Sequence, residues 1–323
     1  MTTPGPATQK VVCLGEALVD RLGPLGGDPA LDRPVDDRLG GAPANVACGL
    51  ARLGTPVGFF GCLGDDLIGE QFSALFQQRG VESSGLQMNP DRPSRIVLVR
   101  RNQEGERQFQ GFAGDQGQGF ADQALGPIHL PKGACWLLVG TIPLATATSA
   151  STLKAVLDQA RQHGTAVALD VNWRPTFWDA AADPAAGPSS DAIAVMRPLL
   201  EQAALIKLAR EEAIWLFGST DPQAISAQLP QAPDVVVTDG AEPVRWWMDG
   251  ASGTQPAFQP QQVVDTTGAG DAFTAGLLHC WAAAPRERIR FAAACGALVC
   301  GGAGGIDPQP TEAQVLAFLG GVS

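Results

Sequence analysis

The sequence predicts an α/β fold with a doubly wound, mostly parallel sheet flanked by helices and a small β-sheet over one end. Three observations predict it: alternating β-rich and helical segments, strands that are apolar throughout, and two segments that interrupt the alternation. Strands covered by helices on both faces are apolar along their whole length. Six such strands are predicted, at residues 11–14, 57–60, 136–139, 167–170, 205–208 and 235–238.

Helical patterns lie between these strands, for example at residues 45–54, 151–164 and 191–203. The first two end at a glycine, as helices often do. Strands that alternate with helices favour a doubly wound sheet. The whole chain, residues 1–323, is therefore predicted to form a single domain.

Two segments do not follow the alternation. Residues 18–39 are rich in Gly, Pro and Asp, and residues 95–112 have the pattern of a hairpin that turns near Glu104 and Gly105. We expect both to form a small β-sheet that acts as a lid, with Arg95 or Phe112 as candidate contacts to a ligand. Exposed sheet edges are normally covered, so pairing of the apolar strand "IVLV" with a second copy, giving a homodimer, is a hypothesis.

Composition argues against several classes of partner. The chain has 22 Lys and Arg against 33 Asp and Glu, a formal net charge of −11, which disfavours binding to nucleic acid. No apolar run is long enough for a membrane span. The seven cysteines include no Cys-x-x-Cys pair, which is typical of reduced thiols in a cytoplasmic protein.

The stretch "DTTGAGDAF", residues 265–273, is the most informative motif. A turn of Gly268, Ala269 and Gly270 at a helix start gathers backbone N–H groups that favour an anion. Asp271 in that turn has a simple interpretation, a carboxylate stabilised by the helix dipole by roughly 0.3–1 kcal/mol. Such a carboxylate does not require glycine on both sides of an alanine. We therefore favour a second interpretation, a general base beside a bound phosphoryl group.

A second motif, "GGAPANVACGLARLG", covers residues 40–54. The paired Gly40 and Gly41 let the backbone approach a ligand, and Asn45 offers the donor and acceptor that suit a sugar hydroxyl. An ordinary helix start, with Pro43 near its first position, explains the same residues. From this motif alone both interpretations stay open.

Together, the two motifs resemble those of the ribokinase-like (PfkB-type) carbohydrate kinases. "GEALVD" near the start and "PTEAQVLAFL" near the end are also similar, and "GEALVD", "GGAPANVA" and "DVNWRP" are most like the fructokinase branch. The resemblance implies a ribokinase-like fold. It also implies transfer of the γ-phosphoryl group of MgATP to a primary hydroxyl, with D-fructose giving fructose 6-phosphate.

The resemblance also implies roles for the residues of the two motifs. Asp271 would be the catalytic base, and the amides of Gly268, Ala269 and Gly270 would form the anion hole. Four residues would hold the sugar hydroxyls: Asp20, Gly40, Gly41 and Asn45. For Asp20, a solvated loop acid is the alternative.

On the nucleotide side, the resemblance implies four contacts: Asn172, Arg174, Thr238 and Gly240. Arg174 has an alternative role, an ion pair with Asp170 or Asp179 that only pins its loop.

Two metal roles follow from the same resemblance. Glu212 would help to hold Mg²⁺ through water, although Ala209 stands where many relatives have the asparagine of Asn-x-x-Glu. Because Mg²⁺ keeps several waters, losing that amide need not abolish binding. Asp265 and residues 300–305 resemble a K⁺ loop. Whether this chain binds K⁺ stays open.

Three other functions are alternatives to this one. Another kinase of the family, acting on ribose, 2-keto-3-deoxygluconate, a nucleoside or a sugar phosphate, would share every phosphoryl-transfer residue. A sugar phosphate would need a basic cluster near Asp20 and Asn45, which the sequence does not reveal. A catalytically silent binding protein is disfavoured because the base and the glycines are present. A dehydrogenase is disfavoured because "VVCLGEALVD" lacks Gly-x-Gly-x-x-Gly.

Overall fold

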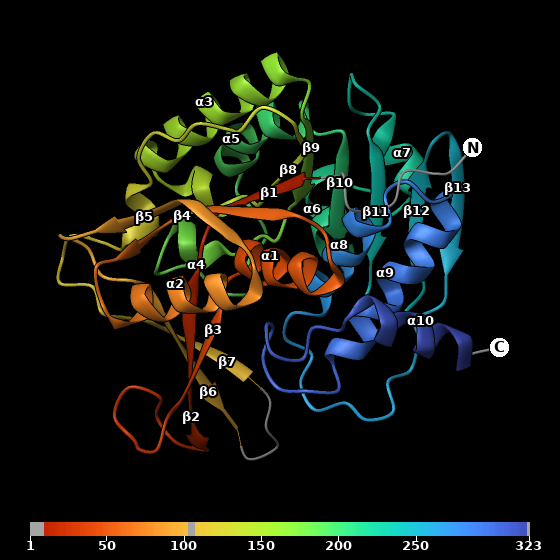
Figure 1. The fold of residues 1–323 in the computed structure, drawn as a ribbon. Coiled ribbons are helices and arrows are strands. Elements are labelled where there is room, and N and C mark those ends of the chain that lie inside the picture. The colour runs from red at the N-terminus through yellow and green to blue at the C-terminus, as the bar shows by residue number, and fades with distance from the viewer. Residues whose placement is uncertain (1–9, 103–106, 322–323) are drawn as a thin grey trace.

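The main sheet of the protein is doubly wound and mostly parallel, as predicted. The computed structural model describes residues 10–102 and 107–321, and within them nine strands lie in the order β13-β12-β11-β10-β9-β8-β1-β4-β5 (Figure 1). The strands are β1 (Lys10–Leu14), β4 (Val57–Gly64), β5 (Glu82–Asn89), β8 (Ala134–Val139), β9 (Ala166–Asp170), β10 (Leu205–Ala209), β11 (Asp234–Thr238), β12 (Val244–Met248) and β13 (Ala251–Gln255). Neighbours from β5 to β11 pair in parallel, and β12 and β13 add an antiparallel edge.

Helices cover both faces of this sheet. Along β1, Val11 and Cys13 belong to one apolar cluster while Val12 and Leu14 belong to the other, because successive side chains of a strand point to opposite faces. The first cluster contains side chains of α1 (Ala42–Leu53), α2 (Leu67–Arg79), α8 (Ala269–His279), α9 (Pro285–Val299) and α10 (Glu312–Gly321). The second contains side chains of α3 (Ala147–His163), α5 (Ser190–Leu200), α6 (Arg210–Phe217) and α7 (Pro222–Ser226).

The strand order reverses between β1 and β8. From this point the chain proceeds through β4 and β5 on one side and through β9, β10 and β11 on the other. Ligands of open α/β sheets bind beyond the carboxyl ends of the strands at such a reversal. Short helices lie in the loops near it: η3 (Ile142–Ala145) follows β8 and α4 (Pro175–Trp178) follows β9.

A second, four-stranded sheet projects from the main body (Figure 1). Its order is β3-β2-β6-β7, with β2 (Leu18–Leu25), β3 (Asp36–Gly40), β6 (Ile96–Arg101) and β7 (Arg107–Ala113). These are the segments for which a small sheet was predicted; the turn expected near Glu104 and Gly105 lies outside the described residues. The "IVLV" strand is β6, which pairs with both β2 and β7. It is thus an interior strand, and the expectation of an exposed edge there was wrong.

Among residues 10–102 and 107–321, no helix combines the length and apolar character needed to cross a membrane. The seven cysteines are free, and the cytoplasmic location predicted from them stays a prediction.

Candidate active site

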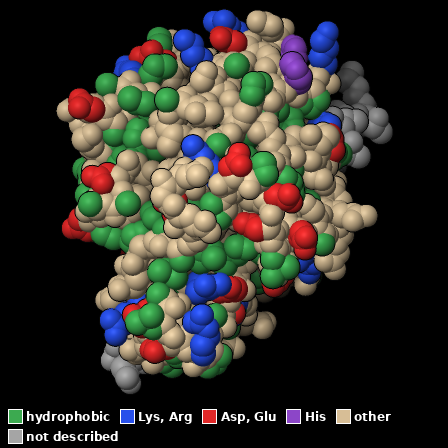
Figure 2. Space-filling view, turned by 90° about the vertical axis from the view of Figure 1, so that its left-hand side faces the viewer, with side chains coloured by type: hydrophobic (Ala, Val, Ile, Leu, Met, Phe, Trp, Pro, Cys, Tyr) green, Lys and Arg blue, Asp and Glu red, His purple; other side chains and the backbone are tan. Residues whose placement is uncertain are grey.

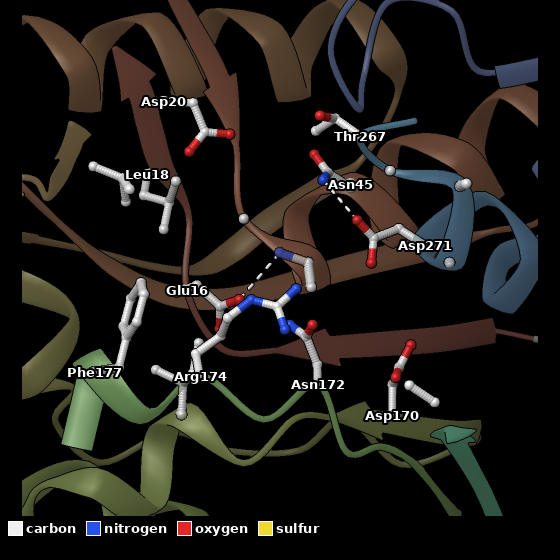
Figure 3. A pocket seen from close by; sticks show the side chains of 18 of the residues that line it. Glu16, Leu18, Asp20, Asn45, Asp170, Asn172, Arg174, Phe177, Thr267 and Asp271 are labelled. Carbon is white, nitrogen blue, oxygen red and sulfur yellow. Dashed lines mark hydrogen bonds between the residues drawn. The ribbon is translucent and has the colours of Figure 1, made fainter. Parts of the chain in front are cut away.

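A pocket of about 530 Å³ opens at the carboxyl ends of the parallel strands, where the chain direction of the sheet reverses. Four of its lining residues come from different strands of the main sheet or from the loop after one: Glu16 after β1, Asp170 at the end of β9, Lys207 in β10 and Thr238 at the end of β11. The N-terminus of α8 and the loop before α4 complete it (Figure 3).

The small sheet covers this pocket with one of its faces. Leu18 and Asp20 of β2 line the pocket, whereas Val19 and Arg21 line a groove of about 680 Å³ beside α2. Successive side chains of a strand point to opposite faces of the sheet, which explains why these residues line two different cavities. Phe109 of β7 adds an aromatic wall to the pocket.

Helix α8 begins at the pocket with its positive end. Its N-cap is Gly268 with φ 79°, and a β-carbon there would lie 2.5 Å from the α-carbon of Gly305. Only glycine therefore allows this turn. The amide of Ala269 donates to the carbonyl oxygen of Thr266 at 3.2 Å, so one of the three amides expected in the anion hole is already engaged. Gly268, Ala269 and Gly270 all line the pocket, as an anion site requires.

Asp271 lies in the first turn of α8 and lines the same pocket. Its Oδ2 accepts a hydrogen bond from Asn45 Nδ2 at 2.8 Å (Figure 3). Burial raises the pKa of Asp271 to about 6, with a smaller upward contribution from Asp170. The hydrogen bond from Asn45 and the charges of Lys207 and Arg174 oppose that rise. A carboxylate with this pKa is charged at neutral pH and is still basic enough to accept a proton.

The residues expected to hold a sugar lie together at one end of the pocket. Asp20, Gly41 and Asn45 line it. A β-carbon on Gly40 would lie 3.4 Å from Asp20 Oδ2 and 4.0 Å from Asn45 Oδ1, so a side chain there would occupy the space between these two groups. Gly41 has φ 101°, and a β-carbon would lie 2.6 Å from the carbonyl oxygen of Glu16.

Three of the four residues expected on the nucleotide side line the pocket: Asn172, Arg174 and Thr238. Gly240 is not among the lining residues. Asn172 has φ 42°, a left-handed conformation that is uncommon outside glycine. The guanidinium of Arg174 points into the pocket (Figure 3).

The two expected metal-site carboxylates each bridge loops. Glu212 accepts the backbone N–H of Trp173 at 2.6 Å and of Ala209 at 2.7 Å, which ties the loop after β9 to the start of α6. Asp265 accepts from Thr267 and from the N–H of Gly304, but it is not among the residues that line the pocket. Glu212 does line it.

Sequence reasoning missed Lys207. Its Nζ lies 3.0 and 3.1 Å from the carboxylate oxygens of Asp170, which also accepts the hydroxyl of Thr274 at 2.9 Å. Asp170, one of the two partners that the sequence suggested for Arg174, thus pairs with Lys207 instead. A β-carbon on Gly270 would lie 2.9 Å from this Nζ, so the ammonium group lies beside the glycine turn. The available signal was a single lysine in the apolar strand "LIKLA".

Glu16 was also missed, although its motif was recognised. It is 3% exposed, and its Oε1 accepts the N–H of Ala42 at the start of α1 at 3.0 Å (Figure 3). Burial raises the pKa of Glu16 to about 8. The signal was a carboxylate directly after an apolar strand, at the end where ligands bind.

The expectation that Arg95 contacts the ligand was wrong. Arg95 is 3% exposed and pairs through two nitrogens with Asp122 of η2 (Ala121–Ala124). Its guanidinium carbon also lies 4.2–4.6 Å from the centres of three rings, those of Phe112, Phe120 and Phe177. This cluster, the Arg95 cage, joins β6 and β7 to the main body. Phe109 and Phe177 are the aromatic residues that reach the pocket.

The arrangement suits the transfer of an anionic group to a hydroxyl. A helix N-terminus and two cations, Lys207 and Arg174, favour negative charge. Beside them stands Asp271, a carboxylate of raised pKa, and Asp20 and Asn45, which can form hydrogen bonds with hydroxyl groups, line the same pocket.

Comparison with known proteins agrees with this chemistry. Residues 8–312 match the family described as "pfkB family carbohydrate kinase". A fructokinase of Klebsiella pneumoniae is 35% identical over 314 residues, which cover 93% of this chain and 96% of that protein.

Solved structures are similar over nearly the whole chain. The fructokinase of Xylella fastidiosa with bound ATP superposes with a TM-score of 0.82 and 28% identity, covering 98% of this chain and 99% of that one. The fructokinase of Vibrio cholerae O395, bound to fructose, ADP and calcium, gives a TM-score of 0.81 and 29% identity, covering 97% and 99%. A double mutant of the latter was solved with fructose, ADP and potassium.

Proposed function

The chain belongs to the pfkB family of carbohydrate kinases, and from that premise we propose that it transfers the γ-phosphoryl group of ATP to D-fructose, forming fructose 6-phosphate. One observation carries the proposal. Asp271 stands at the N-terminus of α8, in one pocket with the hydroxyl-binding pair Asp20 and Asn45. The names of the similar proteins supply the sugar.

The proposed reaction is a direct displacement at phosphorus. Asp20 and Asn45 orient the sugar so that its primary hydroxyl faces Asp271, which takes the hydroxyl proton. A bond forms between that oxygen and the γ-phosphorus, and the bond from the phosphorus to the bridging oxygen of ADP breaks. The amides of Gly268 and Gly270, with Lys207 and Arg174, hold the negative charge of the group in transfer.

The nucleotide is proposed to lie along the wall formed by Asn172, Arg174 and Thr238, with Gly240 just outside that wall. Mg²⁺ fits the acidic part of this wall, because Glu212 lines the pocket and has lone pairs beyond its two backbone contacts. Within the described residues no group of three or more His, Cys, Asp or Glu side chains could hold a metal ion by itself. A Mg²⁺ ion bound mainly by phosphates and water does not need such a group. It would neutralise charge on the phosphates.

We also propose that Asp265 and the carbonyl groups of residues 300–305 form a K⁺ site. The donor set fits, because a carboxylate and backbone carbonyls supply oxygen ligands. The hydrogen bond from Gly304 to Asp265 holds these two segments together.

The small sheet is proposed to act as a lid on a single domain, residues 1–323. Closure over the sugar would exclude water that otherwise hydrolyses ATP.

A homodimer through the small sheet is a further part of the proposal. Because β6 is not an edge strand, the dimer would form through the outer face of the small sheet instead. Val19, Leu39 and Ile96 line the groove on that face, and Leu67 at the start of α2 is 67% exposed. Figure 2 shows hydrophobic side chains gathered between the main body and the small sheet. A second copy would cover them.

The test of the proposed function is ADP release from MgATP with a panel of acceptors: fructose, ribose, 2-keto-3-deoxygluconate, a nucleoside and fructose 6-phosphate. The proposal predicts the highest kcat/KM for fructose, and NMR of the product should place the new phosphate on the 6-oxygen. A higher kcat/KM for another acceptor would overturn the sugar assignment. If no acceptor in the panel led to ADP release, the result would contradict the kinase activity.

A further inference from the structure

We propose that Asn45 is a positioning residue for Asp271: its side-chain amide holds one carboxylate oxygen of the base, which leaves the other to take the proton. The inference rests on the proposed function, in which Asp271 is the base. It adds to the sugar contact expected of Asn45 a role in preparing the base. The contact is direct, 2.8 Å from Nδ2 to Oδ2.

The direction of this hydrogen bond follows from the chemistry of the two groups. A charged carboxylate only accepts, so the amide nitrogen of Asn45 must face Asp271. The amide oxygen, Oδ1, is then directed elsewhere, and within the described residues this buried atom has no hydrogen-bond partner. Buried polar atoms are rarely left without one. A sugar hydroxyl that donated to Oδ1 would satisfy it.

Asn45 is well fixed for such a role. It is 4% exposed, and its backbone N–H donates to the carbonyl oxygen of Gly41 at 2.8 Å. A β-carbon on Gly305 would lie 2.5 Å from Asn45 Nδ2, so the chain at Gly305 closes one side of the amide. The amide is thus packed between that segment and α8, which restricts it to the orientation that meets Asp271.

Charged groups surround Asp271 from every neighbouring element. Asp170 of β9, and Glu16 after β1 when it is ionised, oppose its negative charge, while Lys207 of β10 and Arg174 favour it. Asn45 of α1 is an uncharged neighbour of Asp271, and its side-chain N–H stabilises the charged carboxylate directly. Removing the amide should therefore make Asp271 harder to ionise.

Substrate binding would strengthen the effect. An amide whose oxygen accepts a hydrogen bond becomes a better donor through its nitrogen, because linked hydrogen bonds polarise one another. A sugar bound at Oδ1 would thereby help to keep Asp271 charged. The same amide would couple occupation of the sugar site to readiness of the base.

The experiment is the pH dependence of kcat between pH 5 and 9, with saturating sugar and MgATP, for Asn45→Leu, Asn45→Asp and the matched control Asp20→Asn. Leucine is similar in size and cannot donate, and aspartate replaces the donor by a charge that repels Asp271. Both should move the acidic limb of kcat to higher pH, leucine by about one pH unit and aspartate by more. At pH 7 the leucine variant should lose about tenfold in kcat, about twofold from the smaller ionised fraction of Asp271 and the rest from the lost orientation of its carboxylate. Asp20→Asn should raise KM for the sugar and leave the limb in place.

An acidic limb in either Asn45 variant that coincides with the native one overturns the inference, as does an equal shift in Asp20→Asn. If one Asn45 variant fails to fold, the other decides by the same criterion. Asp271→Asn, measured alongside, separates the two levels of the argument. If its turnover is near native, the proposed base is wrong; if it is inactive while the Asn45 limb stays unmoved, only the positioning role is lost.

Discussion

Three carboxylates of the pocket differ because their partners differ. Asp170 lies against the ammonium group of Lys207. Asp271 has one amide donor and more distant cations, and its pKa rises to about 6. Glu16 has only backbone N–H donors, its own and that of Ala42, with no cation beside it among the described residues, and its pKa rises to about 8. At neutral pH Asp271 is charged and able to accept a proton, whereas Glu16 is mostly a neutral acid.

Glu16→Gln tests this difference by protein stability. The folded protein keeps a proton on Glu16 between its ordinary pKa of 4.5 and about 8, whereas the unfolded chain releases it. The contribution of Glu16 to stability is therefore complete below pH 4.5 and is lost as the pH rises to about 8. Glutamine does not titrate. The variant should gain about 1–4 kcal/mol in unfolding free energy relative to the native protein between pH 5 and pH 9.

Denaturant unfolding of both proteins at pH 5 and pH 9 measures this gain. Subtracting the two curves removes the contribution of Asp271 and other groups that titrate in both proteins. A stability difference that is the same at both pH values would show that Glu16 ionises freely in the folded state.

At the residue scale, sequence patterns revealed the pocket groups that belong to glycine-rich turns. Asp271 and Asn45 lie in the first turns of helices that follow such glycines, and a glycine-rich helix start is a recognisable pattern. Lys207 escaped notice because its importance depends on Asp170, 37 residues away in the sequence and 3.0 Å away in the pocket. Arg95 was misplaced because nothing in the local sequence distinguishes an arginine that contacts a ligand from one that pairs with a distant carboxylate such as Asp122.

Among the elements, the parallel strands were predictable because burial on both faces makes them apolar throughout. Strand β5, "ESSGLQMN", was missed because it lies at the sheet edge and carries polar residues. The small sheet was predicted from two interrupted segments, but its strand order depends on pairing between distant segments. That order places β6 in the interior, which local sequence does not reveal.

The Arg95 cage predicts how the small sheet is held to the main body. Arg95→Lys keeps the charge but loses the paired nitrogens and the planar group between rings. We expect it to lower the unfolding free energy by about 1–3 kcal/mol and to raise KM for the sugar. KM should rise because Phe177 contacts the cage and also lines the pocket.

Arg100→Lys is the matched control, since Arg100 lies in β6, the strand that directly follows Arg95, and is exposed. Thermal unfolding and steady-state kinetics of both variants provide the measurements. Equal effects of the two substitutions would mean that the cage has no special part in holding the small sheet.

At the scale of the whole molecule, the pocket is assembled from segments that are far apart in the sequence. Asp20 comes from the small sheet, Asn45 from α1, Lys207 from the centre of the main sheet and Asp271 from α8. The sequence could supply these residues, but the distances between them depend on how the small sheet, the main sheet and the helix layer of α1 and α8 pack together.

The proposed homodimer predicts a molecular mass in solution of twice the chain mass of 33.5 kDa. Light scattering at micromolar concentration measures it. Ile96→Glu places a charge on the groove face of the small sheet and should reduce the mass to that of one chain. A native protein with the mass of one chain would contradict the dimer and leave the pocket unaffected.

The most direct test of the whole account is fructose-dependent ADP release from MgATP, measured for the native protein and for Asp271→Asn. Asparagine retains the size of the side chain and cannot take a proton, so turnover should fall by about 10²- to 10⁴-fold. Fructose binding, measured by calorimetry, should stay within a few fold of native because Asp20 and Asn45 remain. Turnover of the variant close to that of the native protein would contradict the role of Asp271 as the base.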